Sequence, residues 1–139
     1  MNLKELGRTL PNGFHDAMFK TFKIDYASRE LEIECDILIG DAEGVSYEIR
    51  EGYAQGTLTL SGLQFLVIEP PDSRYSFEEG ALELTSNGCV EGQEFKSTAP
   101  KLPIVPEEAF VHWFFVSNWN SLIFVSALEA KFVWSELAK

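Results

Sequence analysis

The sequence predicts an all-β fold: a single-domain antiparallel β-sandwich or partly open barrel of about seven to nine short strands, with a short N-terminal helical turn. Apolar and charged residues alternate with a period of two over 22–39, which is typical of strands with one buried and one solvated face. No segment carries the clean 3.6-residue periodicity of a long helix. The 139 residues fit one domain, spanning 1–139.

The first elements are a helical turn and a β-hairpin. Residues 2–9 predict the helical turn, which ends before Pro11-Asn12-Gly13. The hairpin is expected from about Ala17 to Ile39, with a two-residue turn at Ser28-Arg29. That turn would place Lys23 opposite Glu34, a favourable cross-strand pair.

Further strands are expected between segments rich in glycine, proline and asparagine. The strand over 57–69 changes phase at Ser61-Gly62, as at a β-bulge. Asn87-Gly88 is a common type I′ turn and predicts a hairpin over 81–96. The segment 110–116 is apolar on both faces, as expected of a central strand. The remaining predicted strands are 45–53 and 122–134.

The charge of the chain restricts its partners. The net charge is −11, and 30–94 contains fifteen acidic residues but only two basic ones, Arg50 and Arg74. Such a surface repels nucleic acid and anionic membranes, and it attracts a basic protein partner. The aromatic content and an open sheet edge also permit a homodimer. We expect a cytoplasmic protein, because the first residues show no secretory signal and the apolar runs are too short to span a bilayer.

The motifs of several enzyme classes are missing from the sequence. It contains no Gly-rich nucleotide-binding motif, no G-x-S-x-G and no H-E-x-x-H. We therefore expect no cofactor and no metal site. Cys35 lies on the apolar side of its strand, whereas Cys89 follows the Asn87-Gly88 turn signal, so a disulfide framework is not expected.

His15 and Asp16 form the first candidate cluster, within Pro11–Ala17. The functional interpretation makes them an acid–base pair. On a strand, however, adjacent side chains point to opposite faces, which would keep the two groups apart. The structural interpretation is a turn in which Asp16 binds backbone N–H groups.

The second cluster lies around the predicted turn at 117–121. His112 either faces a pocket or is a hydrogen-bonded core residue. Trp119 either plugs a corner of the fold or is an exposed anchor for a partner. The side-chain amides beside it suit hydrogen bonding better than bond breaking. The candidate binding residues here are His112, Trp113, Asn118, Trp119 and Asn120.

The third cluster is an acidic row on the polar side of the second strand. Alternation puts its four carboxylates on one face, spaced about 7 Å apart, too far to converge on one cation. The row is therefore either a solvated surface or a docking face for a basic protein. Its members are Glu30, Glu32, Glu34 and Asp36.

The chain resembles a group of small uncharacterised bacterial proteins. The resemblance rests on Leu10–Ala17, on Phe65–Asp72, and on Trp113–Val116 followed by Asn118–Ser121. It implies no catalytic residue. The acidic character and the Asp16-Ala17 start before a β-hairpin also resemble small immunity proteins, which neutralise bacterial toxins.

These sequence patterns support two hypotheses about the function of the protein. The leading hypothesis is a non-enzymatic binding protein, immunity-like, that uses its acidic β-face. The alternative is a small ligand-binding protein or hydrolase with a pocket formed by His15, His112 and Trp119, which would require those side chains to converge.

Overall fold

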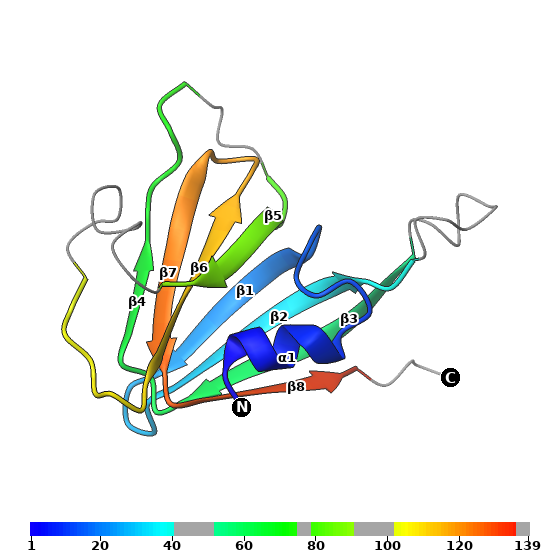
Figure 1. Ribbon diagram of the computed structural model, residues 1–139. Helices are drawn as coiled ribbons and strands as arrows, with labels where there is room; N and C mark the ends of the chain where they lie inside the picture. Colours follow the sequence, from blue (N-terminus) through cyan, green and yellow to red (C-terminus); the bar gives the residue numbers. More distant parts are fainter. Residues whose placement is uncertain (41–51, 75–78, 91–101, 136–139) are drawn as a thin grey trace.

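The computed structural model describes residues 1–40, 52–74, 79–90 and 102–135, which form eight strands and one short helix (Figure 1). The strands make one antiparallel sheet in the order β4-β7-β6-β5-β1-β2-β3-β8. Within the described residues no pairing joins the end strands β4 and β8, so the sheet is not closed and the predicted fold class is confirmed. The elements are α1 Leu3–Thr9, β1 Met18–Asp25, β2 Glu30–Leu38, β3 Tyr53–Ser61, β4 Phe65–Ile68, β5 Leu82–Cys89, β6 Phe110–Val116, β7 Ser121–Ala127 and β8 Glu129–Trp134.

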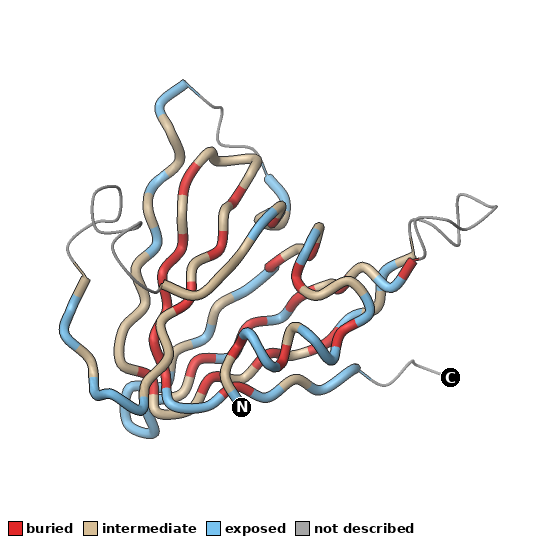
Figure 2. The backbone as a smooth tube through the Cα atoms, viewed as in Figure 1, coloured by how far each residue is buried: buried red, intermediate tan, exposed pale blue. Residues whose placement is uncertain are grey.

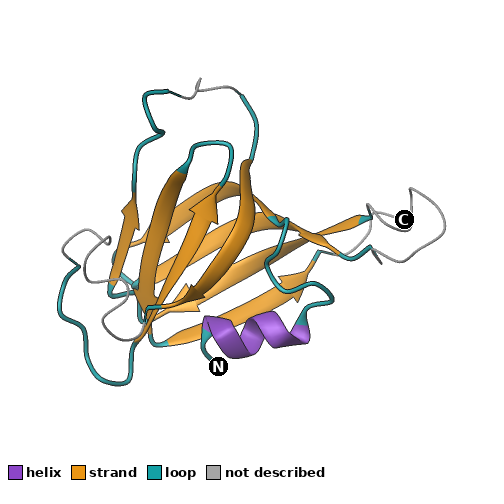
Figure 3. Ribbon diagram, turned by 45° about the horizontal axis from the view of Figure 1, so that its top comes forward, coloured by secondary structure: helices purple, strands orange, loops and turns teal. Residues whose placement is uncertain are grey.

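Helix α1 forms where the sequence predicts a helical turn. Asn2 accepts a hydrogen bond from the backbone N–H of Glu5, and the Glu5 carboxylate accepts one from the backbone N–H of Asn2. The helix ends at Leu10, whose extended backbone suits the residue before a proline. Leu3 and Leu6 are buried, and the helix contacts β6 and β8. Figure 3 shows the helix lying against one side of the sheet.

The core lies between the inward faces of the curved sheet. Buried and exposed residues alternate along β2 as predicted, and Cys35 is fully buried (Figure 2). Phe14, from the segment between α1 and β1, enters this core and makes edge-to-face contacts with Phe19 and Phe114 at 6.5 and 5.5 Å. The N-terminal segment therefore fills the interior that the sheet leaves open.

The first hairpin forms, but the predicted register is wrong by two residues. Lys23 pairs with Glu32 rather than Glu34, because four residues, 26–29, connect the strands. Asp25 caps this turn by accepting hydrogen bonds from the backbone N–H groups of Ala27 and Ser28. These bonds, chiefly that from Ser28, lower the pKa of the Asp25 carboxyl below its usual value.

The predicted bulge at Ser61-Gly62 is a corner at which the chain passes from β3 to β4. Gly62 has φ +64°, and a Cβ there would lie 2.7 Å from side-chain atoms of Leu128. Leu128 makes the matching corner between β7 and β8 and donates its backbone N–H to the Ser61 carbonyl. The β3–β8 pairing therefore continues around the corner as the β4–β7 pairing.

The predicted turn at Asn87-Gly88 is wrong, since both residues lie inside β5. Gly88 pairs with Trp113, and a Cβ at Gly88 would lie 2.9 Å from the indole Nε1. Close approach of an aromatic ring, rather than a turn, accounts for this glycine.

β6 lies between β5 and β7, which confirms the predicted central strand. Most of the predicted strand 45–53 falls outside the described residues.

Candidate functional site

His15 and Asp16 do come together, contrary to the expectation based on strand geometry. They lie in the turn before β1, where Asp16 has φ +60°. In this conformation the His15 Nε2 lies 3.3 Å from the Asp16 carboxylate, and Nδ1 lies 2.7 Å from the Thr85 carbonyl oxygen. Thr85 lies where the β5–β6 register shifts, so His15 fastens the turn to an irregular point of β5.

His112 is a buried, hydrogen-bonded residue on the inner face of β6. Its side chain contacts Phe114, with ring centroids 5.0 Å apart, and its Nε2 lies 2.8 Å from the Asn87 Oδ1. Burial lowers the pKa of His112 from 6.5 to about 4, so the ring is neutral near pH 7. Since a carbonyl oxygen only accepts, Nε2–H is the donor in this bond.

The two asparagines of the 117–120 turn form hydrogen bonds to segments that lie beside the turn. Asn118 accepts from the backbone N–H of Glu83 and donates to the Ala81 carbonyl, at 3.0 and 3.1 Å. Asn120, at φ +49°, donates to the Asp72 carboxylate at 3.1 Å. These side chains therefore bind other parts of this chain.

Asp72 also binds the side chain of Arg74, two residues further along the chain. Its carboxylate accepts hydrogen bonds from the Arg74 guanidinium at 2.8 and 3.1 Å. These bonds, followed by those from the Arg74 backbone and Asn120, hold the pKa of the Asp72 carboxyl well below its usual range. The carboxylate therefore stays ionised and keeps the 117–120 turn attached to the segment after β4.

Within the part of the chain that the structure describes, His15, His112 and Trp119 do not line a common pocket among those at His112 and Trp119. Trp119 packs against the core cluster and lines a surface pocket beside Met18 and Asn118. His112 lines a different pocket, under α1, and His15 lines neither of these two. Trp113 lies on β6 opposite Gly88, with an orientation opposite to that of His112 in the alternating strand. The candidate residues are thus distributed over several places in the fold.

The acidic row lies on the outer face of β1, β2, β3 and β8, which we call the acidic face. Successive cross-strand rows differ in charge. One row contains Asp25, Glu30 and Glu129, whereas the next contains Lys23 beside Glu32, followed by Thr59 on β3 and a lysine on β8. The face as a whole carries six carboxylates and three lysines, namely Asp25, Glu30, Glu32, Glu34, Asp36 and Glu129 with Lys20, Lys23 and Lys131.

Three carboxylates of the acidic face already have partners, and Asp25 is one of them because it accepts two backbone hydrogen bonds in the β1–β2 turn. Asp36 forms an ion pair with Lys20 at 3.1 Å, and Glu129 lies 3.5 Å from the N-terminal ammonium. Glu32 and Glu34 are exposed, and Glu34 lies between two threonines. The carboxylates at the middle of β2 are therefore the ones best placed to meet another molecule.

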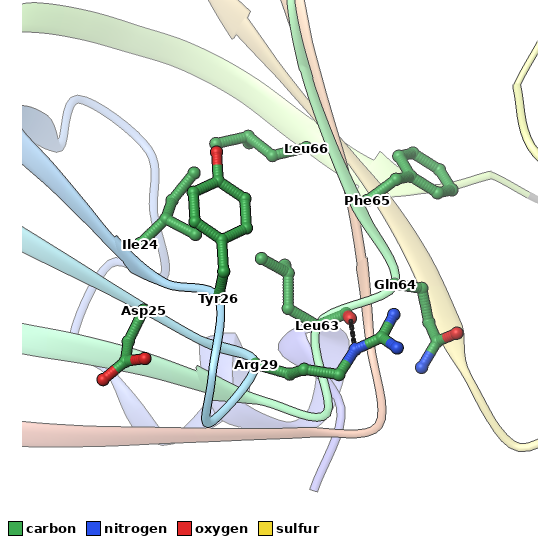
Figure 4. Close-up of a pocket in the computed structure, with 8 residues that line it drawn as sticks. All are labelled: Ile24, Asp25, Tyr26, Arg29, Leu63, Gln64, Phe65 and Leu66. Carbon is green, nitrogen blue, oxygen red and sulfur yellow. Dashed lines mark hydrogen bonds between the residues drawn. The ribbon is translucent and has the colours of Figure 1, made fainter.

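A pocket of about 380 Å³ lies beside the β1–β2 turn, and Asp25 is the lining residue that it shares with the acidic face (Figure 4). Ile24, Leu63 and Leu66 provide apolar surface, and the Tyr26 side chain beside them is 83% exposed. Arg29 donates its Nε–H to the Leu63 carbonyl at 3.1 Å, which fixes the guanidinium at the rim. We call this the turn pocket.

Only part of the turn pocket has a signal in the sequence. Tyr26 continues the apolar alternation of β1 beyond the last pairing, but at Arg29 the sequence pattern predicts only a connecting turn. The contribution of Leu63 and Leu66 depends on the corner at Gly62, which brings the start of β4 close to the first hairpin. Such a contact between distant segments is not visible in local periodicity.

Within the described residues, no group of three histidine, cysteine or acidic side chains is arranged to hold a metal ion. Over the same residues, no helix has both the length and the apolar character needed to cross a membrane. The chain matches no protein-family model, no curated protein and no solved structure. Any function must therefore be argued from the surfaces just described.

Proposed function

We propose that this chain is a non-enzymatic binding protein that docks a basic partner protein on the acidic face. The observation that carries the proposal is the excess of carboxylates over lysines on one continuous polar surface. Complementary charge of this kind accelerates association and excludes acidic partners. An immunity protein that neutralises a basic toxin is one instance of this class.

The spacing of the carboxylates favours a protein over a small cation. Glu32 and Glu34 are on the same face of β2, about 7 Å apart, and both are exposed. Calcium and magnesium need several oxygens within about 2.6 Å of one point. Lysine and arginine side chains projecting from a second protein can meet separate carboxylates one by one.

The turn pocket supplies an apolar anchor point next to the acidic face. Asp25 belongs to both surfaces, and Ile24, Leu63 and Leu66 offer apolar area beside it. Charge steers a partner to a surface, but buried apolar anchors usually supply most of the binding energy. A partner that combines basic side chains with one protruding apolar side chain would match both features.

Charge reversal tests the proposal. We would immobilise the wild-type chain, Glu32→Lys/Glu34→Lys, and the control Glu107→Lys/Glu108→Lys, which changes the net charge equally at exposed residues that are not part of the acidic face. Proteins captured from the native host would be identified, purified and titrated against each variant at low and high salt. We expect the variant on β2, but not the control, to lose about tenfold or more in affinity.

The proposal is overturned if both variants bind alike, or if the affinity of the wild-type chain is indifferent to salt. Light scattering of the isolated chain addresses the homodimer. A dimer that persists in Glu32→Lys/Glu34→Lys would place self-association elsewhere, whereas one lost in that variant would make a second copy the occupant of the acidic face.

A further inference from the structure

The two edges of the sheet differ in how well they are protected against pairing with another strand. At one edge, β4 has only four residues and is closely followed by Pro70-Pro71, which makes it a poor template. At the other edge, β8 has six residues and lies outermost beside β3 (Figure 1). The second half of β8, residues 132–134, contains neither a charged residue nor a proline. This half therefore has none of the usual defences of an edge strand.

The backbone groups of β8 point alternately toward β3 and away from it. The Ser135 N–H donates to the Gln55 carbonyl, so the odd-numbered residues direct their backbone groups at β3. The even-numbered residues direct theirs away from the sheet. Among the described residues, the hydrogen bond on that side joins the Ala130 N–H to the Met1 carbonyl. The backbone groups of Phe132 and Trp134 are left for a strand outside the molecule.

The exposed side chains at this end of β8 are apolar on both faces of the sheet. Val133 is 53% exposed on the outer face, and Trp134 is 42% exposed on the inner one. The Trp134 ring packs edge-to-face on Phe132, with centroids 4.7 Å apart. Phe132 lies directly over Gly56, where a Cβ would overlap its ring. The tryptophan therefore rests on a fixed neighbour while much of its indole stays in solvent.

We propose that this half of β8 is the contact surface for a second copy of the chain, which pairs with it antiparallel about Val133. In this register Val133 faces its own counterpart, and Phe132 faces Trp134 of the second copy. Phe132 and Trp134 exchange their outward backbone hydrogen bonds, and two-fold symmetry forms this pair twice. The sheets of the two copies then continue into one another.

The side chains of β8 are complementary to one another in this register. On the inner face an aromatic ring meets an aromatic ring, since Phe132 lies beside Trp134 of the second copy. On the outer face the two exposed Val133 side chains meet. Lys131 falls opposite Ser135, so the register opposes no like charges. A second copy therefore covers the apolar side chains exposed on both faces at this end of the edge.

Other antiparallel registers of β8 on itself fit less well. Registers centred on any of residues 130–132 require the Ala130 N–H, which the Met1 carbonyl already occupies. A register centred on Trp134 puts Val133 opposite a serine instead of an apolar side chain. Pairing about Val133 combines the unpaired backbone groups with apolar contacts on both faces, and this selects it among the five.

The dimer carries both acidic faces on the same side of the joined sheet, because paired residues of antiparallel strands share a face. Each copy has a net charge of −11, which opposes association, and salt screens this repulsion. Self-association should therefore strengthen as salt is added. Docking of a basic partner on the acidic face should weaken under the same change, so the failure of one proposal can be distinguished from the failure of the other.

The test is sedimentation velocity of the full chain from about 10 µM to about 0.5 mM, because one pair of edge strands is smaller than a standard interface of about 1,600 Å² and should give a weak dimer. Val133→Lys and Val133→Glu should each weaken the dimer by about tenfold or more, because each opposes like charges on the two-fold axis. An equimolar mixture of these two variants should regain the association, since opposite charges then meet. The matched control Ile68→Lys, at a 40% exposed residue of the β4 edge, should dimerise as the wild-type chain does.

Three results would overturn the proposal. The first is a wild-type chain that stays monomeric over the whole concentration range at high salt. The second is a dimer that both Val133 variants retain, which would place the contact elsewhere. The third is a mixture of the two variants that associates no better than either one alone, which would separate Val133 from the two-fold axis. Circular dichroism of each variant shows that the comparison refers to folded protein.

Discussion

The buried His112 should make the protein lose stability on mild acidification. Burial lowers its pKa from 6.5 to about 4 in the folded chain. Below about pH 6.5 the unfolded chain therefore protonates this ring while the folded chain keeps it neutral. Because the unfolded state then binds more protons, the free energy of unfolding falls as the pH drops from about 6.5 toward 4. Above about pH 6.5 the ring contributes no pH dependence.

The size of this loss of stability follows from the difference between the His112 pKa in the unfolded and in the folded chain. Each pH unit within the window costs about 1.4 kcal/mol, so lowering the pH to about 5 should remove about 2 kcal/mol. The full loss below pH 4 is about 3 kcal/mol, a considerable part of the stability of an ordinary domain. His112 is only 2% exposed, so solvent screening reduces the effect little.

Urea unfolding of the wild-type chain and His112→Gln at several pH values between about 7.5 and 5 measures this slope. The substitution will change stability by some constant amount, but only the change with pH matters. All other titratable groups are present in both proteins, so the difference between the two curves reports on His112. We expect the two curves to converge by about 2 kcal/mol at pH 5. Parallel curves would refute a neutral, desolvated His112.

Further substitutions test the core, the turns and the glycines, each by urea unfolding. Phe14→Ala should cost about 3–5 kcal/mol, because it removes a fully buried ring from the centre of the core, and a loss below 1 kcal/mol would contradict this. Asn118→Ala removes two hydrogen bonds to the segment at the start of β5 and should cost about 1–2 kcal/mol. Gly7→Ala, within α1 and with ordinary contacts, should stabilise by about 0.5–1 kcal/mol. Gly88→Ala should destabilise by about 1–3 kcal/mol and alter tryptophan fluorescence, because Trp113 must move.

The fold class could be predicted because a strand that is buried on one side has apolar and polar residues in alternation. The alternation in β2 is confirmed residue by residue, and the capped helix ends within a residue of its predicted end. The register of the first hairpin could not be predicted, because it depends on the Asp25 side chain capping a four-residue turn. Asn87-Gly88 misled the prediction because a strand glycine facing an aromatic ring has the same local sequence as a turn.

The candidate sites were less predictable than the fold. The His15–Asp16 contact depends on a left-handed backbone at Asp16, whereas the strand rule assumed an extended one. The pairing of Cys89 with His112 depends on which strands are neighbours, and periodicity does not contain that information. The chemical groups that each residue carries are known from the sequence. Which of them come into contact across the fold depends on the order of the strands in the sheet.

The pairing of β3 with β8 also determines when this chain can fold on the ribosome. Leu58 pairs with Phe132, so the β3 edge of the first three strands has no partner until β8 has been synthesised, whereas the β1 edge pairs earlier, with β5. During that interval the nascent chain carries an unpaired strand edge beside an apolar face. Completion of the sheet must therefore follow synthesis of β8, and contacts so distant along the chain are typical of slow-folding domains.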